Sequence, residues 1–134
     1  TTPTEMERTY ISASDDRSLF YREFREALIA AGVNLVDAET NATATFTILY
    51  DHTDQRVLSV SARNVPTEYE VYYTIEYTLD SGANSLLEPQ MLTLTRDYTY
   101  DPTLVLGKEH EQQLLRDAIV EDLVRIVLKQ IAAL

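Results

Sequence analysis

The chain has 134 residues, no cysteine, and 22 acidic residues against 11 basic ones, which gives a formal net charge of −11. This length favours one domain spanning residues 1–134, and the acidic balance disfavours a nucleic-acid binder, which needs a basic surface to neutralise phosphates. The absence of cysteine excludes disulfides, thiol nucleophiles and metal sites built from thiolates.

The N-terminal residues predict a short strand followed by an amphipathic helix. Residues 7–12 (ERTYIS) alternate as a strand does, and the oxygens of Ser14 or Asp15 then suit the free amides of a helix start. Gly32 is expected to end the helix, because glycine readily adopts the left-handed backbone that helix ends use. The apolar residues that recur at helical spacing between these points are Phe20, Phe24, Ala27, Leu28 and Ala31.

Residues 43–62 predict either one long strand or two strand pieces. Apolar residues alternate along the segment, but the polar run DHTDQ at residues 51–55 interrupts them. We therefore expect a bend or bulge at this run, with the even-numbered apolar residues on the core face on both sides of it. These residues are Ala44, Phe46, Ile48, Tyr50, Leu58, Val60 and Ala62. Residues 63–66 (RNVP) then predict a turn.

The strongest strand signal is the stretch TEYEVYYTIEYTL at residues 67–79. Its odd-numbered residues after Thr67 are aromatic or aliphatic, and its even-numbered ones are mostly acidic or hydroxylated. Only a strand places alternate residues on opposite faces, so this stretch predicts a central strand with one covered and one solvent-facing side. The polar side consists of Glu68, Glu70, Tyr72, Thr74, Glu76 and Thr78.

The C-terminal half predicts one more strand, at residues 90–100, and a long helix at residues 109–134. Arg96 falls on the apolar side of that strand. We expect it either to be turned outward by a bulge or to lie at the sheet edge with its head group paired, because an unpaired buried charge is costly. The predicted fold class is α+β, with a single mostly antiparallel four-stranded sheet and two helices packed on one face, in the order β-α-β-β-β-α.

No catalytic or metal motif stands out, and we expect no enzyme activity, metal or cofactor. His52 and His110 lack metal-ligand spacing to each other, and three glycines are too few for phosphate-binding loops. The run around Asp51 is more typical of a polar bulge than of a site. A carboxylate pair among Glu68–Glu76 would need an enclosed apolar pocket, so an acidic enzyme site is the weaker alternative. No apolar run is long enough for a transmembrane helix.

The strand directions predict that three basic residues lie at one end of the sheet. The turn at Arg63, the start of the last helix at Lys108 and the start of the first helix at Arg17 should all reach this end. The apolar residues Val65, Leu104, Val105 and Leu106 should lie beside them. A cationic group next to apolar surface suits an amphipathic anion such as a phosphorylated lipid. Ordinary loop charges over the end of the core are the alternative.

Three stretches together resemble the LptE family, the lipopolysaccharide-assembly lipoproteins of Gram-negative bacteria. They are REFREALIAAGVNLVD at residues 22–37, EYEVYYTIEYTL at residues 68–79, and the sequence from residue 92 to the end. The most specific parts are the Arg-Asn turn before the central strand, the R-D-Y-x-Y-D strand end and the L-G-K-E-x-E-Q helix start. Their order and spacing extend the resemblance over nearly the whole chain.

The resemblance implies a non-enzymatic plug inside the outer-membrane β-barrel LptD, which helps the barrel to assemble and to insert lipopolysaccharide into the outer leaflet. It also implies lipopolysaccharide contacts at Arg63 and Lys108, whereas Arg17 rests on topology alone. The polar strand face would then meet the barrel lumen, which is polar in such barrels. A purely structural plug without lipid binding is the alternative.

Proteins of this family begin with a lipidated cysteine, which this sequence lacks. We therefore expect a segment without the anchor, from a protein held at the periplasmic side of the cell outer membrane. The net charge of −11 is unfavourable for an anionic ligand. Lipopolysaccharide binding therefore requires local basic contacts, or divalent cations that bridge carboxylates and phosphates.

Overall fold

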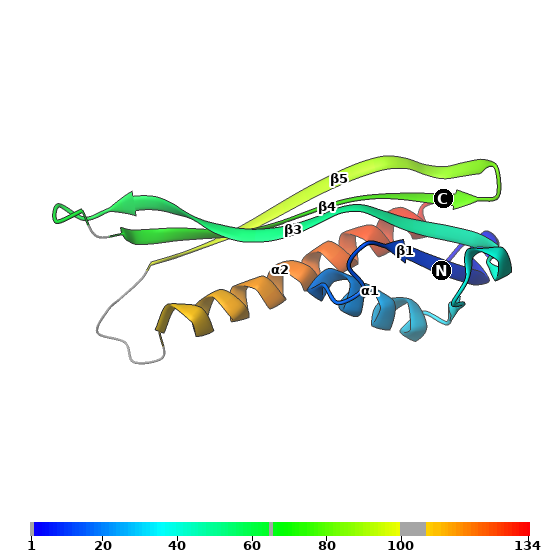
Figure 1. Ribbon diagram of the computed structural model, residues 1–134, viewed down its shortest axis with the longest axis horizontal. Helices are drawn as coiled ribbons and strands as arrows, with labels where there is room; N and C mark the ends of the chain where they lie inside the picture. Colours follow the sequence, from blue (N-terminus) through cyan, green and yellow to red (C-terminus); the bar gives the residue numbers. More distant parts are fainter. Residues whose placement is uncertain (1, 65, 100–106) are drawn as a thin grey trace.

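The structure is a computed structural model that describes residues 2–64, 66–99 and 107–134, with the side chains of the last helix described from His110 onward. A sheet and two long helices form two layers (Figure 1). In chain order the elements are η1 (Thr4–Met6), β1 (Arg8–Ala13), α1 (Leu19–Ala30), β2 (Asn34–Leu35), η2 (Glu39–Asn41), β3 (Ala44–Val60), β4 (Pro66–Ser81), β5 (Asn84–Thr99) and α2 (Gly107–Ala132). The two η elements are short 3-10 turns.

The sheet has five strands in the order β2-β1-β3-β4-β5 and is mixed, with two parallel and two antiparallel pairings, so the prediction of four mostly antiparallel strands was wrong in both details. After Gly32 the chain returns beside β1, and Asn34–Leu35 pairs with it in parallel. β1 also pairs in parallel with β3, as a strand-helix-strand crossover through α1 allows. A strand of two residues is too short to show alternation in a sequence, so β2 left no pattern to recognise.

The first helix begins later than the sequence indicated. Ser18, not Ser14 or Asp15, caps α1, because its side chain accepts a hydrogen bond from the amide of Tyr21 at 3.0 Å. Asp15 instead accepts from the amide of Arg17, 2.9 Å away, within the preceding loop. The predicted end is confirmed: Gly32 has a φ of 89°, in the left-handed region.

The strand predicted at residues 67–79 is confirmed as β4, whose odd-numbered residues from Tyr69 to Leu79 are all buried, although the middle strand of the sheet is β3 and β4 lies between β3 and the edge strand β5. A tight turn at Gly82 and Ala83 leads directly into β5, which therefore starts earlier than the predicted residue 90. Gly82 has a φ of 59°, a conformation that glycine adopts without the steric cost of a side chain. β3, β4 and β5 thus form a long antiparallel meander.

β3 is one continuous strand, but a register shift at Leu49 reverses its two faces. Before the shift, Phe46 and Ile48 lie on the core face opposite Leu79 and Tyr77. After it, Asp51 lies opposite Ile75 on the core face, and Tyr50 lies opposite Glu76 with 46% of its surface exposed. The predictions that Tyr50 and Val60 face the core were therefore wrong, because one extra residue reverses the parity of the strand after it. Leu58 and Ala62, also predicted on the core face, are exposed.

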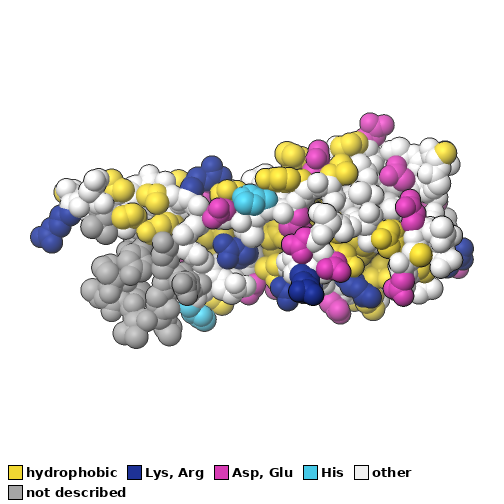
Figure 2. Space-filling model, in the orientation of Figure 1, with side chains coloured by type: hydrophobic (Ala, Val, Ile, Leu, Met, Phe, Trp, Pro, Cys, Tyr) yellow, Lys and Arg dark blue, Asp and Glu magenta, His cyan; other side chains and the backbone are white. Residues whose placement is uncertain are grey.

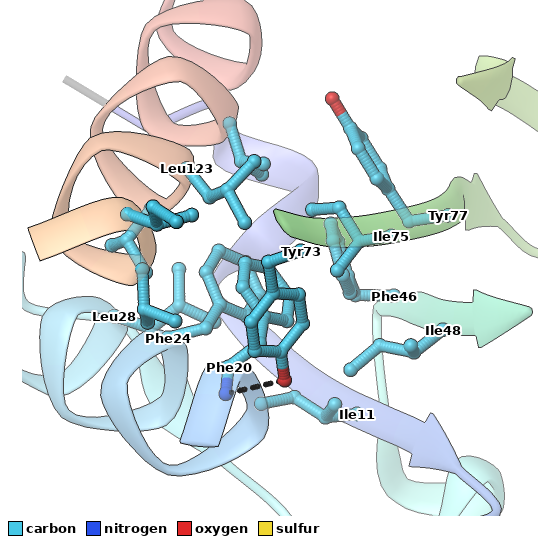
Figure 3. Packing of buried hydrophobic residues seen from close by; sticks show 14 of the residues in the cluster. Ile11, Phe20, Phe24, Leu28, Phe46, Ile48, Tyr73, Ile75, Tyr77 and Leu123 are labelled. Carbon is cyan, nitrogen blue, oxygen red and sulfur yellow. Dashed lines mark hydrogen bonds between the residues drawn. The ribbon is translucent and has the colours of Figure 1, made fainter. Parts of the chain in front are cut away.

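Both helices cover the same face of the sheet, as predicted (Figure 1). The core between the layers is largely aromatic near α1 (Figure 3). The ring centres of Phe24 and Phe46 lie 4.4 Å apart, and those of Phe46 and Tyr77 lie 5.2 Å apart. The buried residues of α2 start at Ile119 and end at Ile131. Within the described ranges, no helix is both long and apolar enough to cross a membrane.

Arg96 fits the second of its two predicted alternatives. It lies on β5, the edge strand, opposite Val71 on the core face. Its guanidinium pairs with Asp122 of α2 at 2.5 Å, and Asp122 also pairs with Arg125 at 2.6 Å. The hydrogen bond from Arg96 is the main reason why the pKa of Asp122 is lowered.

Candidate functional site

The face of the sheet that neither helix covers carries regular cross-strand rows of polar side chains. Neighbouring rows contain Tyr50, Glu76 and Met91, then His52, Thr74 and Thr93, then Asp54, Tyr72 and Thr95, then Arg56, Glu70 and Asp97. We call these residues, together with Glu68, the outer face. The five residues predicted to face a partner, Glu68, Glu70, Tyr72, Thr74 and Glu76, all belong to it.

The outer face is held together by direct contacts between its rows. Arg56 pairs with Glu70 at 2.8 Å, and its guanidinium carbon lies 4.4 Å from the centre of the Tyr72 ring, a cation–π arrangement. His52 lies between Tyr50 and Tyr72, with ring centres 6.1 and 5.9 Å away. The result is an open sheet surface whose charged side chains are mostly acidic and which also carries aromatic groups.

Sequence reasoning missed Tyr50, His52 and Arg56 as members of this face. The three residues follow the register shift at Leu49, so their parity could not be read from the residues before it. The polar or aromatic character of Tyr50, His52 and Asp54 could have indicated an open face, but such side chains fit either face of a strand equally well.

The outer face does not enclose the carboxylates that an acidic enzyme site would need. Glu68 is exposed, and Glu70 and Glu76 are half-buried in an open sheet surface. One hollow of the described structure is lined by Tyr10, Tyr21 and Arg25, on the other side of β3 from the strand that carries these glutamates. The described residues also contain no group of three or more His, Asp or Glu side chains arranged to hold a metal ion.

Arg63 lies in the turn between β3 and β4, at the far end of a hairpin that extends beyond the helices (Figure 1). Its side chain is exposed and has no carboxylate partner among the described residues. Figure 2 shows basic and hydrophobic side chains together at this end of the molecule. Arg63 is therefore free to bind an external anion.

Lys108 is the second residue of α2, which begins toward the same end of the molecule as the β3–β4 hairpin (Figure 1). Its side chain lies outside the described residues. The same holds for Val65, Leu104, Val105 and Leu106, the apolar residues expected beside the three bases. The predicted apolar surroundings of the site therefore stay a prediction.

Arg17 does not lie at this end, so the predicted group of three bases is not formed. Its neighbour Ser18 donates a hydrogen bond to Asp51 at 2.5 Å, which places the start of α1 at the middle of β3. Val60 follows nine residues later, about 30 Å further along the strand. The prediction was wrong because β3 continues far beyond the point where β1 ends and α1 begins.

An apolar group at the end of β3 is a second feature that the sequence did not reveal. Val57, Leu58 and Val60 are 49%, 45% and 51% exposed. Leu58 and Val60 had been predicted to face the core, and their exposure overturns that interpretation. Val57 lies opposite Tyr69 on the helix side and is nevertheless exposed. The sequence contains one indication that this segment differs from the rest of the chain, because positions 57 to 64 contain no acidic residue.

Under the helices, polar side chains fix β3 to its covering elements. Asp51 accepts hydrogen bonds from Ser18 and Tyr73, and Thr53 accepts one from Arg116 at 2.9 Å. Further along, Gln112 donates to Gln55 and to the hydroxyl of Tyr98. Burial, assisted by the bond to Asp51, raises the pKa of Tyr73 far above its ordinary value. These groups are satisfied within the protein and are structural.

Comparison with known families gives a match to the family model described as LptE, lipopolysaccharide-assembly, over residues 6–131. No curated protein matches the chain.

Solved structures with the same fold include two with about one quarter sequence identity. Rare lipoprotein B from Shewanella oneidensis is 26% identical, with a TM-score of 0.78 and 94% of each chain covered. The uncharacterized lipoprotein B from Nitrosomonas europaea is 25% identical, with a TM-score of 0.80 and coverage of 96% of this chain and 83% of that one. A minor lipoprotein from Acinetobacter baumannii shares the fold at 21% identity, with a TM-score of 0.77 over 98% of this chain and 94% of that one.

Proposed function

This chain belongs to the LptE lipopolysaccharide-assembly family, and we propose that it is the non-enzymatic plug subunit of an outer-membrane lipopolysaccharide transporter. In this role it occupies the lumen of an LptD-like β-barrel, assists the assembly of that barrel and binds lipopolysaccharide for insertion into the outer leaflet. The observation that carries the proposal is the family match across residues 6–131, which includes nearly all of the described fold.

The outer face supports the plug role. A sheet with one face covered by helices and one open face has a single large surface for a partner. That surface carries Thr, Glu and Asp side chains in cross-strand rows, which suits the polar lumen of an outer-membrane barrel. Because Glu68, Glu70 and Glu76 are accompanied by one arginine, Arg56, the matching wall of the barrel should offer basic groups or hydrogen-bond donors.

Arg63 and Lys108 support the binding of lipopolysaccharide. Arg63 is exposed and unpaired among the described residues, and its guanidinium can bind a phosphate through two parallel hydrogen bonds. Lys108 begins a helix that starts toward the same end of the molecule. The net charge of −11 repels an anion at a distance, so binding depends on these local contacts or on bridging divalent cations.

The proposed location is the periplasmic side of the outer membrane, with a lipid anchor on the native protein. Co-purification of the lipidated full-length protein from outer membranes tests the plug role. We expect a large β-barrel to remain bound through detergent extraction. Recovery of the lipoprotein without any barrel partner would contradict the proposal.

A further inference from the structure

The end of the β3–β4 hairpin has a composition unlike the rest of the chain. Residues 57–64, VLSVSARN, contain no acidic residue and one basic residue, whereas the whole chain has 22 acids in 134 residues. We call these eight residues the hairpin tip. Val57, Leu58 and Val60 expose about half of their surface there. Large apolar side chains grouped at one exposed place usually mark a binding surface.

The apolar side chains of the hairpin tip lie on both faces of the sheet. Val57 is opposite Tyr69 and therefore faces the helix side, whereas Val60 is opposite Pro66 and shares the side of the outer face. The two residues are three positions apart, so strand alternation places them on opposite faces, and the two register shifts between them, one on each strand, cancel. β5 ends at Thr99, opposite Glu68, so beyond that row the described sheet consists of two strands.

Val57 lies in a row that still has three strands, because Tyr69 pairs with Tyr98 of β5, whereas Val60 lies on the two-stranded end of the hairpin. Both side chains remain about half exposed, so the fold itself does not bury the apolar groups on either face of the tip. The flat wall of a protein partner covers one face, and the polar lumen of a barrel suits neither. Flexible acyl chains can cover both faces at once. The exposed Arg63 beyond Val60 adds the charge that complements an anionic head group.

We propose that the acyl chains of lipopolysaccharide lie along both faces of the hairpin tip, from Val60 back toward Val57, while Arg63 holds a phosphate of the head group. From Val57 to Val60 the strand rises about 10 Å. This apolar length fits within one leaflet of hydrocarbon, which is about 15 Å thick. The inference rests on the proposed binding of lipopolysaccharide and adds the orientation of the ligand on the protein.

Tryptophan fluorescence can test the proposal directly, because the chain has no tryptophan of its own. Leu58→Trp places a single reporter in the proposed acyl site, and Ala62→Trp places one close to Arg63. Ile29→Trp is the matched control, because Ile29 on α1 is 47% exposed, close to the 45% of Leu58. Unchanged urea midpoints would show that all three variants keep the fold.

On adding purified lipopolysaccharide, we expect the emission of Leu58→Trp to move to shorter wavelength more than that of Ala62→Trp, and that of Ile29→Trp to stay unchanged. Leu58→Ser should weaken binding about tenfold, since it loses the burial of one large apolar side chain, whereas Ile29→Ser should not weaken it.

Sedimentation of the protein with lipopolysaccharide distinguishes the two ways in which this could fail. If the protein sediments with the lipid but Leu58→Trp shows no shift, the acyl site is wrong and the proposed function stands. If Ala62→Trp shifts more than Leu58→Trp, the proposed orientation is wrong. A shift of Leu58→Trp only in the barrel complex would assign the hairpin tip to the barrel instead. If the unaltered protein does not bind lipopolysaccharide, the proposed function itself fails.

Discussion

The hydroxyl of Tyr73 donates a hydrogen bond to Oδ1 of Asp51 at 2.5 Å, and so joins the centre of β4 to β3 beneath α1. The other carboxylate oxygen of Asp51 accepts from the hydroxyl of Ser18, which caps α1. The amide of Phe20 in turn donates to the hydroxyl of Tyr73 at 3.1 Å (Figure 3). One buried tyrosine therefore connects two strands with the first turn of a helix, and water cannot replace these contacts.

Replacing Tyr73 with phenylalanine should lower the free energy of unfolding by about 1–3 kcal/mol. The change removes the hydroxyl alone and leaves the amide of Phe20 and one oxygen of Asp51 without their partner. Urea denaturation followed by circular dichroism measures the loss.

Tyr72→Phe provides the matched control on the adjacent residue. Tyr72 lies on the outer face, and phenylalanine keeps the ring that Arg56 contacts. We expect a change within about 0.5 kcal/mol. Equal losses in the two variants would show that the Tyr73 hydroxyl does not stabilise the fold as the structure indicates.

Stability should decrease in alkaline solution because two tyrosines ionise less readily in the folded state than in the unfolded state. Burial raises the pKa of Tyr77 to about 12, and burial with the bond to Asp51 raises the pKa of Tyr73 further. A raised pKa means that the folded chain binds more protons above pH 10, so unfolding becomes easier as the pH rises. Below about pH 10 the stabilisation is fully present.

The comparison of Tyr73→Phe with the unaltered protein isolates one of these two groups. The difference in unfolding free energy should be constant below about pH 10 and should shrink above it, because only the unaltered protein loses stability through Tyr73. Urea midpoints measured between neutral and strongly alkaline pH give this curve. A difference that does not vary with pH would contradict the assigned protonation of Tyr73.

β4 could be predicted because its alternation is unbroken from Tyr69 to Leu79 and has the two-residue period of a strand. The helix end at Gly32 follows from the left-handed backbone that glycine readily adopts, and the cost of an unpaired buried charge limited Arg96 to two alternatives, one of which the structure shows. Each of these features depends either on a few neighbouring residues or on a regular two-residue alternation, and both can be read from the sequence.

The site could be predicted only in part, because its geometry depends on non-local register. The single extra residue at Leu49 decides that Asp51 faces the core and His52 the solvent. The polar run after it is compatible with either choice. The distance between Arg17 and Arg63 likewise depends on how far β3 continues past β1. The types of the side chains do not determine this length. The outer-face residues on β4 were predictable because the strand that carries them pairs without a shift from Tyr69 to Ile75.

The Arg96–Asp122 pair should make a small contribution that depends on pH and salt. Asp122 is on the surface, and its two arginine partners lower the pKa of its carboxyl. A lowered pKa gives stability above the ordinary range of aspartate, and this stability is lost as the pH falls through the folded-state value. A double-mutant cycle of Arg96→Met and Asp122→Asn should give a coupling of less than about 1 kcal/mol at neutral pH that weakens in high salt. A coupling free energy that stays unchanged at acidic pH or in high salt would show that the two side chains interact by packing and not by charge.

Charge reversal at the centre of the outer face should prevent assembly with the barrel and leave the fold intact. Glu76 lies between Tyr50 and Met91 in its cross-strand row. Glu76→Arg should lose the barrel in co-purification, because it places a positive charge against a wall expected to be basic or donor-rich. Its urea midpoint should remain close to that of the unaltered protein.

Glu26→Arg serves as the control for this variant, since Glu26 is exposed on α1 in the opposite layer. It makes the same change of charge away from the outer face. We expect the barrel to be retained. If Glu26→Arg loses the barrel and Glu76→Arg keeps it, the helical layer is the surface that contacts the barrel.

Reversing the charge at Arg63 or Lys108 should weaken lipopolysaccharide binding roughly tenfold for each residue, because each change removes a charge-assisted hydrogen bond to a phosphate. Arg17→Glu is the control, because the start of α1 lies near the middle of β3 and makes no part of the hairpin tip. Binding can be measured by sedimentation with purified lipopolysaccharide, and assembly by co-purification of the barrel. If the double variant still binds lipopolysaccharide as well as the unaltered protein and also retains the barrel, Arg63 and Lys108 do not form the lipid site, and the chain binds the lipid through other residues.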